Sequence, residues 1–287
     1  MSADLLAVAL GLFSALTLAT TNLVVKATND VLMTRTALSI SAALIVAPVA
    51  FFVPLPTPSL WGALAVSVPV HLFYQVSLIR AMHRGDLSLV FPVMRGLAPL
   101  LVAIAAYFRL GENLSPVSIV GLLISVCAVM SFAFLRGKKA GLTQSLSGSA
   151  MFWAAMTAVG VMAYSVADAS GIRTAENRFT FIVWLFILDC IGVTVIALVV
   201  RQDRFWSGFR PVMKSGFLAA MLGVASYGAA LYGFSIAEAA RITALRETAV
   251  IFGALMGWLI LKESMGPRRI IASVILVCGL ALMELGA

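Results

Sequence analysis

Charged residues are scarce in this chain. Asp, Glu, Lys and Arg make up only 11% of its 287 residues, whereas about 25% of the residues in soluble domains are charged. Apolar residues account for 62%, and the mean hydropathy is +1.05. Because no soluble fold could bury so much apolar surface, the composition excludes a soluble globular protein and indicates an integral membrane protein.

Cysteine and histidine are also rare. The three cysteines, Cys127, Cys190 and Cys278, lie in apolar runs without CxxC or Cys/His spacing, so neither a disulfide framework nor a zinc site is predicted. His71 and His83 have no partners at metal-ligand spacing. The sequence also lacks the Ser/Lys or HExxH-type groups that an intramembrane enzyme would need. We therefore expect no metal, no cofactor and no enzymatic activity.

Apolar runs follow one another along almost the whole chain. Each is bounded by charged residues, Pro or Gly and has about the 20 residues that a membrane-spanning helix needs. A backbone in lipid must satisfy its own hydrogen bonds, which favours helices. The sequence therefore predicts an all-α integral membrane protein with ten transmembrane helices, at 5–26, 32–53, 60–80, 87–108, 115–135, 148–170, 179–200, 215–236, 242–261 and 269–286.

The two halves of the chain are similar at a constant offset of 151 residues. The shift superposes charged residues and prolines, namely Arg95 on Arg246, Glu112 on Glu263 and Pro116 on Pro267. Such matches are a more specific sign of duplication than matched aliphatic residues. We expect one five-helix repeat over 1–140 and a second over 141–287. Because each half has an odd number of spans, the repeats should be inverted, which supports alternating access to a midplane site.

Two segments resemble a known family. The runs beginning AMHRGDLSLVFPVMRG at 81–126 and AARITALRETAVIFG at 239–263 are similar to the EamA repeat of the drug/metabolite transporter superfamily. The resemblance extends over nearly all of the chain. It implies a ten-helix inverted-repeat bundle. It also implies secondary transport, often export, of amino acids, nucleotide-derived compounds, vitamins or similar metabolites.

Basic residues are divided unevenly between alternate loops. The loops after the odd-numbered spans hold 14 Lys and Arg, and the opposite side holds four, Arg109, Arg173, Arg178 and Arg241. By the positive-inside rule the more basic side faces the cytoplasm. We therefore expect a multi-pass protein of the bacterial inner membrane with both termini in the periplasm, whereas many members of the resembled family carry both termini inside. Membrane orientation explains the net charge of +8 better than nucleic-acid binding does.

Ionisable residues inside the predicted spans are candidate functional residues, because a charge near the bilayer centre is unfavourable. Arg95 lies eight residues into the fourth span, and Arg246 is its repeat mate. Two arginines in one cavity would offer forked donors for a substrate carboxylate or phosphate. Alternatively, each neutralises a buried carboxylate or donates to the carbonyls of a broken helix. Glu247 would receive a proton or an ammonium group, or would bond to another helix.

A second set of polar residues could carry a proton or close the site. Asp189 lies in the middle of the seventh span, where a low dielectric favours a neutral carboxyl group that suits a coupling proton. A structural hydrogen bond is the alternative. An offset of 142 aligns Asn22 and Lys26 with Tyr164 and Asp168. Lys26 and Asp168 would form a gate while Asn22 and Tyr164 contact substrate, unless both charges merely reach water from helix ends.

Aromatic residues complete the predicted site. The candidates for a cavity wall are Tyr74, Gln75, Trp184 and Tyr227, together with Phe73 and Tyr232. An aromatic wall would hold a planar or quaternary-ammonium substrate, although interfacial anchoring or packing is an alternative role. Glu112 and Glu263 each precede a predicted helix start, where negative charge is stabilising, so they are interpreted as structural.

Together these observations predict a secondary-active transporter that works by alternating access, and the family resemblance implies that it is an exporter. Its substrate would be a small polar metabolite such as an amino acid or another carboxylate- or phosphate-bearing compound. The alternatives are a lipid-linked sugar flippase or a non-transporting membrane protein. The expected partners are the substrate and the lipid bilayer, and the chain would act as a monomer or homodimer.

Overall fold

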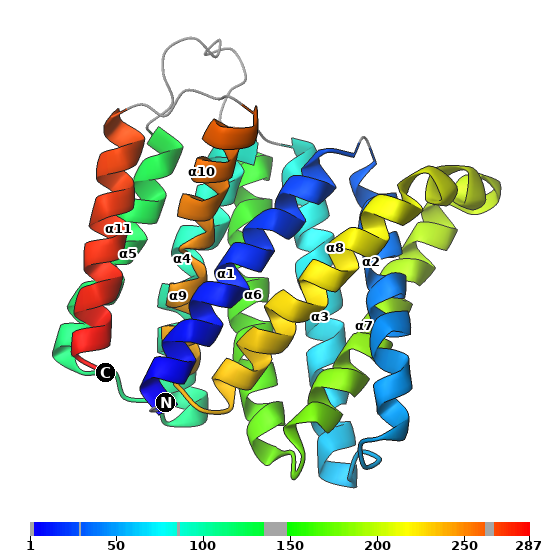
Figure 1. The fold of residues 1–287 in the computed structure, drawn as a ribbon, viewed down its shortest axis with the longest axis horizontal. Helices are drawn as coiled ribbons and strands as arrows, with labels where there is room; N and C mark the ends of the chain where they lie inside the picture. The colour runs from blue at the N-terminus through cyan, green and yellow to red at the C-terminus, as the bar shows by residue number, and fades with distance from the viewer. Residues whose placement is uncertain (1–2, 29, 85–86, 135–147, 262–266) are drawn as a thin grey trace. The chain divides into compact units, whose positions relative to one another are not determined.

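The computed structural model describes residues 3–28, 30–84, 87–134, 148–261 and 267–287. Every regular element in these ranges is a helix (Figure 1). The helices are α1 (Ala3–Lys26), α2 (Val31–Val46), η1 (Ala47–Phe51), α3 (Pro58–Arg84), α4 (Leu87–Leu110), α5 (Pro116–Phe134), α6 (Gly148–Thr174), α7 (Arg178–Arg201), η2 (Gln202–Arg204), α8 (Phe205–Phe234), α9 (Ala239–Arg246), α10 (Ala249–Leu261) and α11 (Pro267–Leu285).

Six helical segments in the described residues are long and apolar enough to cross a membrane. They are Ala3–Val25, Val31–Phe51, Pro58–Ala81, Val93–Leu110, Gly148–Thr174 and the continuous stretch Arg178–Phe234. Two further apolar helices, Pro116–Ser131 and Ile270–Leu285, are shorter. The all-helical fold and the multi-pass membrane character agree with the sequence analysis. The count of ten crossings and the inversion of the repeats stay predictions.

The predicted spans differ from the observed helices mainly at breaks. The stretch predicted as 32–53 ends its α-helix at Val46 and continues as the 3₁₀ turn η1, whose first turn contains Pro48. The stretch predicted as 242–261 is divided between α9 and α10. The helix α8 begins at Phe205, ten residues before the predicted start at 215, and contains Pro211. Apolar runs alone do not reveal such breaks and extensions, because the apolar run continues on both sides of a break.

The chain folds into two compact units. Unit 1 comprises residues 1–73 and 167–237, and unit 2 comprises residues 74–166 and 238–287. Each unit therefore contains parts of both predicted repeats. The boundaries between the units fall inside α3 and inside α6, so each of these helices contributes one segment to each unit.

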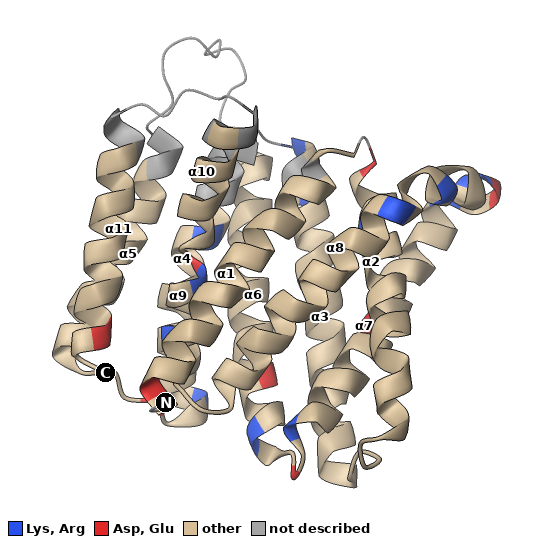
Figure 2. Ribbon diagram, in the orientation of Figure 1, with Lys and Arg blue, Asp and Glu red and all other residues tan. Residues whose placement is uncertain are grey.

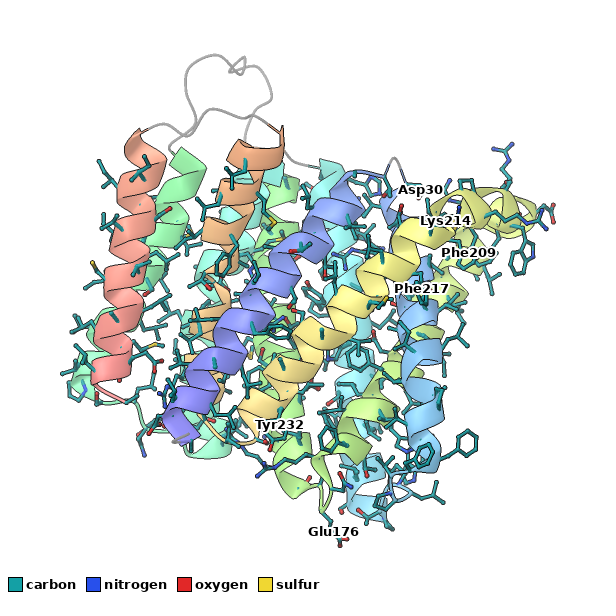
Figure 3. All side chains as sticks on the ribbon, viewed as in Figure 1. Asp30, Glu176, Phe209, Lys214, Phe217 and Tyr232 are labelled. Carbon is teal, nitrogen blue, oxygen red and sulfur yellow. The ribbon has the colours of Figure 1, made fainter. Side chains whose placement is uncertain are left out.

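Unit 1 is built on α1, α2, α7 and α8, with α8 packed against both α1 and α2. The helices α2 and α7 begin at Asp30 and Asn177, whose side chains accept hydrogen bonds from the backbone N–H groups of Met33 and Phe179. Figure 3 places Asp30 and Lys214 toward one end of the helices of this unit, and Glu176 and Tyr232 toward the other. Connections at alternating ends are what a sequence of membrane-crossing helices requires.

Unit 2 is held together largely by α5 and α11, which lie side by side (Figure 1). A Cβ atom on Gly121 would lie only 2.4 Å from the backbone nitrogen of Met283, so glycine is needed for this close approach. The Ser118 hydroxyl donates to the Met283 carbonyl oxygen at 2.9 Å. The helix α4 packs against α5 on one side and α9 on another.

Charged residues lie mostly near helix ends (Figure 2). The helices α4 and α9 of unit 2 are notable because they carry buried arginines: Arg95 on α4, and Arg241 and Arg246 on α9. All eight residues of α9 are buried, including Arg241, Thr243 and Arg246. A short helix with this much buried charge requires specific partners, and these partners form the first candidate site.

Candidate functional site

Arg95 is the centre of a buried ion pair in unit 2. Its Nε donates to Oε2 of Glu247 at 3.1 Å, and its Nη2 donates to the main-chain carbonyl oxygen of Arg246 at 3.1 Å. Arg95 is 9% exposed and Glu247 is 2% exposed. Arg95 thus both neutralises a buried carboxylate and satisfies a carbonyl oxygen at a helix break. The second carboxylate oxygen, Oε1 of Glu247, is buried without a hydrogen-bond partner among the described residues.

The helix break that receives Arg95 lies at Glu247 and Thr248. The helix α9 ends at Arg246, and the N–H groups of Glu247 and Thr248 bond back to Ala244 and Leu245. The last carbonyl groups of a helix have no intrahelical donor, so the Arg246 carbonyl oxygen can accept the hydrogen bond from Arg95. This explains why a guanidinium group on α4 is held at this position.

The opposite end of α9 is also held by charged side chains. Both carboxylate oxygens of Glu112 accept from the N–H of Ala239, at 3.0 and 2.9 Å. Arg241 donates to the Glu284 carboxylate on α11, with a shortest distance of 2.6 Å. Glu112 therefore lies at a helix N-terminus, but at that of α9 rather than that of the helix following it in sequence. Its repeat mate Glu263 lies outside the described residues.

Two tyrosines flank Arg95 within unit 2. The Tyr74 and Tyr164 rings form an edge-to-face pair with centroids 5.1 Å apart, and both residues interact electrostatically with Arg95. A Cβ atom on Gly160 would lie 2.9 Å from the Cα of Tyr74, so α3 and α6 approach closely here. Gln75, also on α3, is buried. We call Arg95, Arg246, Glu247, Tyr74 and Tyr164 the arginine cluster.

Unit 1 contains a different buried polar group, centred on Asp168. This residue is 0% exposed. Its Oδ2 accepts a hydrogen bond from the Tyr227 hydroxyl at 2.5 Å and lies 2.7 Å from Nε2 of His71. Its Oδ1 is buried and has no hydrogen-bond partner among the described residues. We call His71, Asp168 and Tyr227 the carboxylate cluster. Asp168 lies near the end of α6, yet its carboxyl group is enclosed instead of reaching water.

Aromatic packing encloses this second cluster. Tyr227 contacts His71 and Phe186 edge to face, with centroids 5.4 and 6.4 Å apart. Trp184, on the same helix as Phe186, packs edge to face on Trp61 at 5.3 Å. The indole N–H of Trp184 is buried without a hydrogen-bond partner among the described residues.

The structure thus divides the residues predicted from sequence between the two units. The arginine cluster takes in Arg95, Arg246, Glu247, Tyr74 and Tyr164, with Gln75 in the same unit; unit 1 holds Asn22, Asp168, Trp184, Asp189 and Tyr227. The side chain of Lys26 lies outside the described part of the chain, so its predicted gate with Asp168 stays a prediction. Asn22 and Asp189 are partly buried, on α1 and α7.

His71 is the site residue that the sequence analysis missed. It was considered only as a metal ligand, for which sequence spacing gave no partner. Its carboxylate partner is 97 residues away on another helix. The one available signal was its position in the interior of an apolar run, where an ionisable side chain needs a partner. In the described residues there is no group of three or more His, Cys, Asp or Glu that could hold a metal ion.

Comparisons with known proteins complement this geometry. The sequence model of the EamA-like transporter family matches residues 1–134 and 145–285. A WAT1-related chloroplastic protein of Arabidopsis thaliana is 21% identical over 192 residues, which are 65% of this chain and 46% of that protein. The match therefore spans less than half of that relative. A crystal structure with 22% sequence identity superposes with a TM-score of 0.74, over 100% of this chain and 99% of the other. At this identity, the likeness shows a common fold.

Proposed function

Because this chain belongs to the EamA-like transporter family, we propose that it is a secondary-active exporter of a small polar metabolite such as an amino acid or another carboxylate- or phosphate-bearing compound. The family makes it a membrane protein of a transport class, with a small-molecule substrate and the lipid bilayer as partners. The substrate class, the direction and the role of each residue are our proposal.

The observation that carries the proposal is the buried ion pair of Arg95 and Glu247. A guanidinium group remains charged at any physiological pH and matches the geometry of a carboxylate or phosphate. Here it already binds a carboxylate, through a single 3.1 Å bond from Nε to one oxygen of Glu247. An anionic substrate group can therefore take the place of Glu247 without leaving Arg95 unpaired. Substrate binding becomes an exchange of one carboxylate for another.

The exchange gives Glu247 a second role. Once displaced from Arg95, its carboxylate can pair with the ammonium group of an amino acid or take up a proton, as predicted from sequence. The pair lies at the break between α9 and α10. Because both helices are short, the backbone at the break can change conformation without unfolding a long helix. Tyr74 and Tyr164 would contact the rest of the substrate beside Arg95.

Alternating access is supported by the pairing of helices. In an inverted repeat, corresponding helices of the two halves meet across the pseudo-twofold axis. The offset of about 150 residues relates α2 to α7, α4 to α9 and α5 to α11, and each of these three pairs packs together within its own unit. These three pairings support the duplication of the chain, while α8 packs on α1 and α2, which are not its repeat mates. We propose that proton antiport drives export across a bacterial inner membrane, with both termini periplasmic.

Reconstitution of the purified full-length protein tests the proposal. A thermal-shift screen against a metabolite library should first show stabilisation by compounds that carry a carboxylate or phosphate. Liposomes loaded with an unlabelled L-amino-acid mixture should then take up the radiolabelled mixture by counterflow. Scrambling of fluorescent lipids without flux of any soluble compound would instead support a flippase and overturn the proposal.

A matched arginine control makes the assay specific. Arg109 lies on the same helix as Arg95 but is exposed near its end. Counterflow should therefore survive Arg109→Met. If Arg109→Met lost as much counterflow as a variant of the buried pair, then positive charge on α4 in general, and not the site, would support the flux.

A further inference from the structure

The carboxylate cluster of unit 1 is built differently from the substrate site proposed above. Asp168 is fully enclosed, and its partners come from two other helices, His71 from α3 and Tyr227 from α8. An isolated carboxylate in a low-dielectric interior is strongly unfavourable, so it is either neutralised or protonated. The partner that approaches at 2.7 Å is an imidazole, whose charge changes near neutral pH.

We propose that His71, Asp168 and Tyr227 form the site that binds and releases the transported proton. This inference rests on the proposed function and names the coupling site within it. The ligand is a single proton, taken up from the acidic side of the membrane and released on the other side.

The geometry defines the two states of the site. In the loaded state, the His71–Asp168 pair holds two protons: one between Nε2 of His71 and Oδ2 of Asp168, and one on Nδ1 of His71. The pair is then neutral overall, whether it is described as imidazolium and carboxylate or as imidazole and carboxylic acid. The Tyr227 hydroxyl donates its own hydrogen to Oδ2. Release of one proton leaves a carboxylate that accepts from neutral imidazole and from the phenol, with a net charge of −1. No bond other than N–H or O–H is broken.

Two features suit a proton site better than a structural bond. Asp168 Oδ1 is buried and has no hydrogen-bond partner in the part of the chain that the structure describes, so the carboxylate is only half satisfied and can receive a proton or a water molecule there. A purely structural buried carboxylate normally has its oxygens satisfied. The second feature is the hydrogen bond that the Tyr227 hydroxyl donates to Oδ2, which gives the deprotonated carboxylate a partner.

The other titratable groups of unit 1 lie further along their helices than the residues of the carboxylate cluster. On α7, whose Phe186 ring contacts Tyr227, the carboxyl group is Asp189, one turn further along. Arg173, the basic residue of the last turn of α6, donates to the carbonyl oxygens of Phe234 and Ala237. The remaining charged residues on α1 and α2 lie toward the helix ends: Asp4, Lys26, Asp30 and Arg35.

The cluster lies close to the ends of the segments that α3 and α6 contribute to unit 1. Unit 1 ends within α3 at Phe73, two residues after His71, and resumes within α6 at Ala167, one residue before Asp168.

Liposomes containing the full-length protein test this site. With the radiolabelled L-amino-acid mixture as probe, the wild type should accumulate label when the lumen is more acidic than the outside, because outward proton flow drives the antiport. Asp168→Asn should lose this accumulation but keep counterflow without a gradient, since the amide can accept the Tyr227 bond but cannot exchange a proton. Asp203→Asn, which removes an exposed carboxylate on η2, should behave like the wild type.

Proton release by the purified protein provides a readout without substrate. After an alkaline pH jump in weakly buffered solution, a pH-sensitive dye should report about one proton less per chain from the double variant His71→Gln/Asp168→Asn than from the wild type. Tyr227→Phe keeps the His–Asp pair, so it should still release the proton.

The outcomes separate the two proposals. Wild-type accumulation by Asp168→Asn, or unchanged proton release from the double variant, would overturn the proton site. If a folded Asp168→Asn lost both counterflow and accumulation, the proton site would also be overturned, because Asp168 would then hold the substrate's ammonium group. If the wild type showed no counterflow, only the proposed function would be refuted. The proton-release measurement would still test the proton site.

Discussion

The two buried clusters each enclose a carboxylate, but they neutralise it in different ways. In the arginine cluster of unit 2, Glu247 faces a guanidinium group that stays charged. In the carboxylate cluster of unit 1, Asp168 faces an imidazole and a phenol. The first arrangement holds a fixed positive charge, for which a substrate anion can compete with Glu247. The second can gain or lose charge with pH. On this difference we base the proposal that the substrate binds in the arginine cluster and the proton in the carboxylate cluster.

The largest expected effect is the removal of one partner from the arginine cluster. Arg95→Met leaves the carboxyl group of Glu247 2% exposed without its ion-pair partner, and breaking a buried pair in this way destabilises by about 3–5 kcal/mol. Thermal unfolding in detergent should show a large loss of stability. The double variant Arg95→Met/Glu247→Met should recover most of it, since both charges are gone. A double variant as unstable as the single one would show that Arg95 acts through its other contact, with the Arg246 carbonyl.

The next effect changes the competition for Arg95. Glu247→Gln keeps a group of similar size that still accepts a hydrogen bond but removes the negative charge, at an expected loss of roughly 1–3 kcal/mol of stability. Without its carboxylate competitor, Arg95 should bind an anionic ligand more tightly. The thermal shift caused by the L-amino-acid mixture or by phosphate should therefore increase relative to the wild type. A smaller shift for both ligands would mean that Glu247 contributes to binding instead of competing with it.

A smaller effect is expected in the carboxylate cluster. Tyr227→Phe removes one of the two hydrogen bonds to Asp168 Oδ2, and such a loss destabilises by about 1–3 kcal/mol. Because the Phe ring preserves the contacts with His71 and Phe186, thermal unfolding should change less than in Arg95→Met. An equal or larger loss would contradict the idea that the unit 1 cluster can exist in two charge states at little cost.

The smallest effect is expected for an ion pair near the surface. Arg201 and Asp30 are paired in unit 1 with their side chains 39% and 28% exposed. Exposed pairs contribute about 0–1 kcal/mol, and Asp30 would keep its bond to the Met33 N–H in Arg201→Gln. Thermal unfolding of this variant should differ little from that of the wild type. A loss comparable with Arg95→Met would show that burial is not what distinguishes the two clusters.

The sequence was sufficient for much of the fold because lipid imposes strong constraints. Apolar runs of about 20 residues can only be helices in a membrane, so most elements from α1 to α7 begin and end close to their predicted limits, whereas α2 ends early and continues as η1. The break between α9 and α10 could not be predicted, because Glu247 and Thr248 interrupt the helix without a proline or glycine. Only the contact of Arg95 with the Arg246 carbonyl explains how the break is stabilised.

The candidate site was predicted less completely, since its contacts join distant parts of the chain. The charge and depth of Arg95 identified it as a candidate, but its pairing with Glu247 spans 152 residues. Asp168 was identified through a repeat offset that pointed to Lys26, whereas its observed partners are His71 and Tyr227. Glu112 was interpreted through its sequence neighbours, although it binds Ala239, 127 residues away. One sequence reveals candidate residues, but not which helices face one another.

Counterflow of the radiolabelled L-amino-acid mixture by Arg95→Met/Glu247→Met is the most direct test of the central claim. This variant lacks both charges of the arginine cluster yet should remain folded, and Arg109→Met serves as its control. We predict counterflow in the wild type and in Arg109→Met, and none above protein-free liposomes in the double variant. Wild-type counterflow by a folded double variant would contradict the assignment of substrate binding to Arg95.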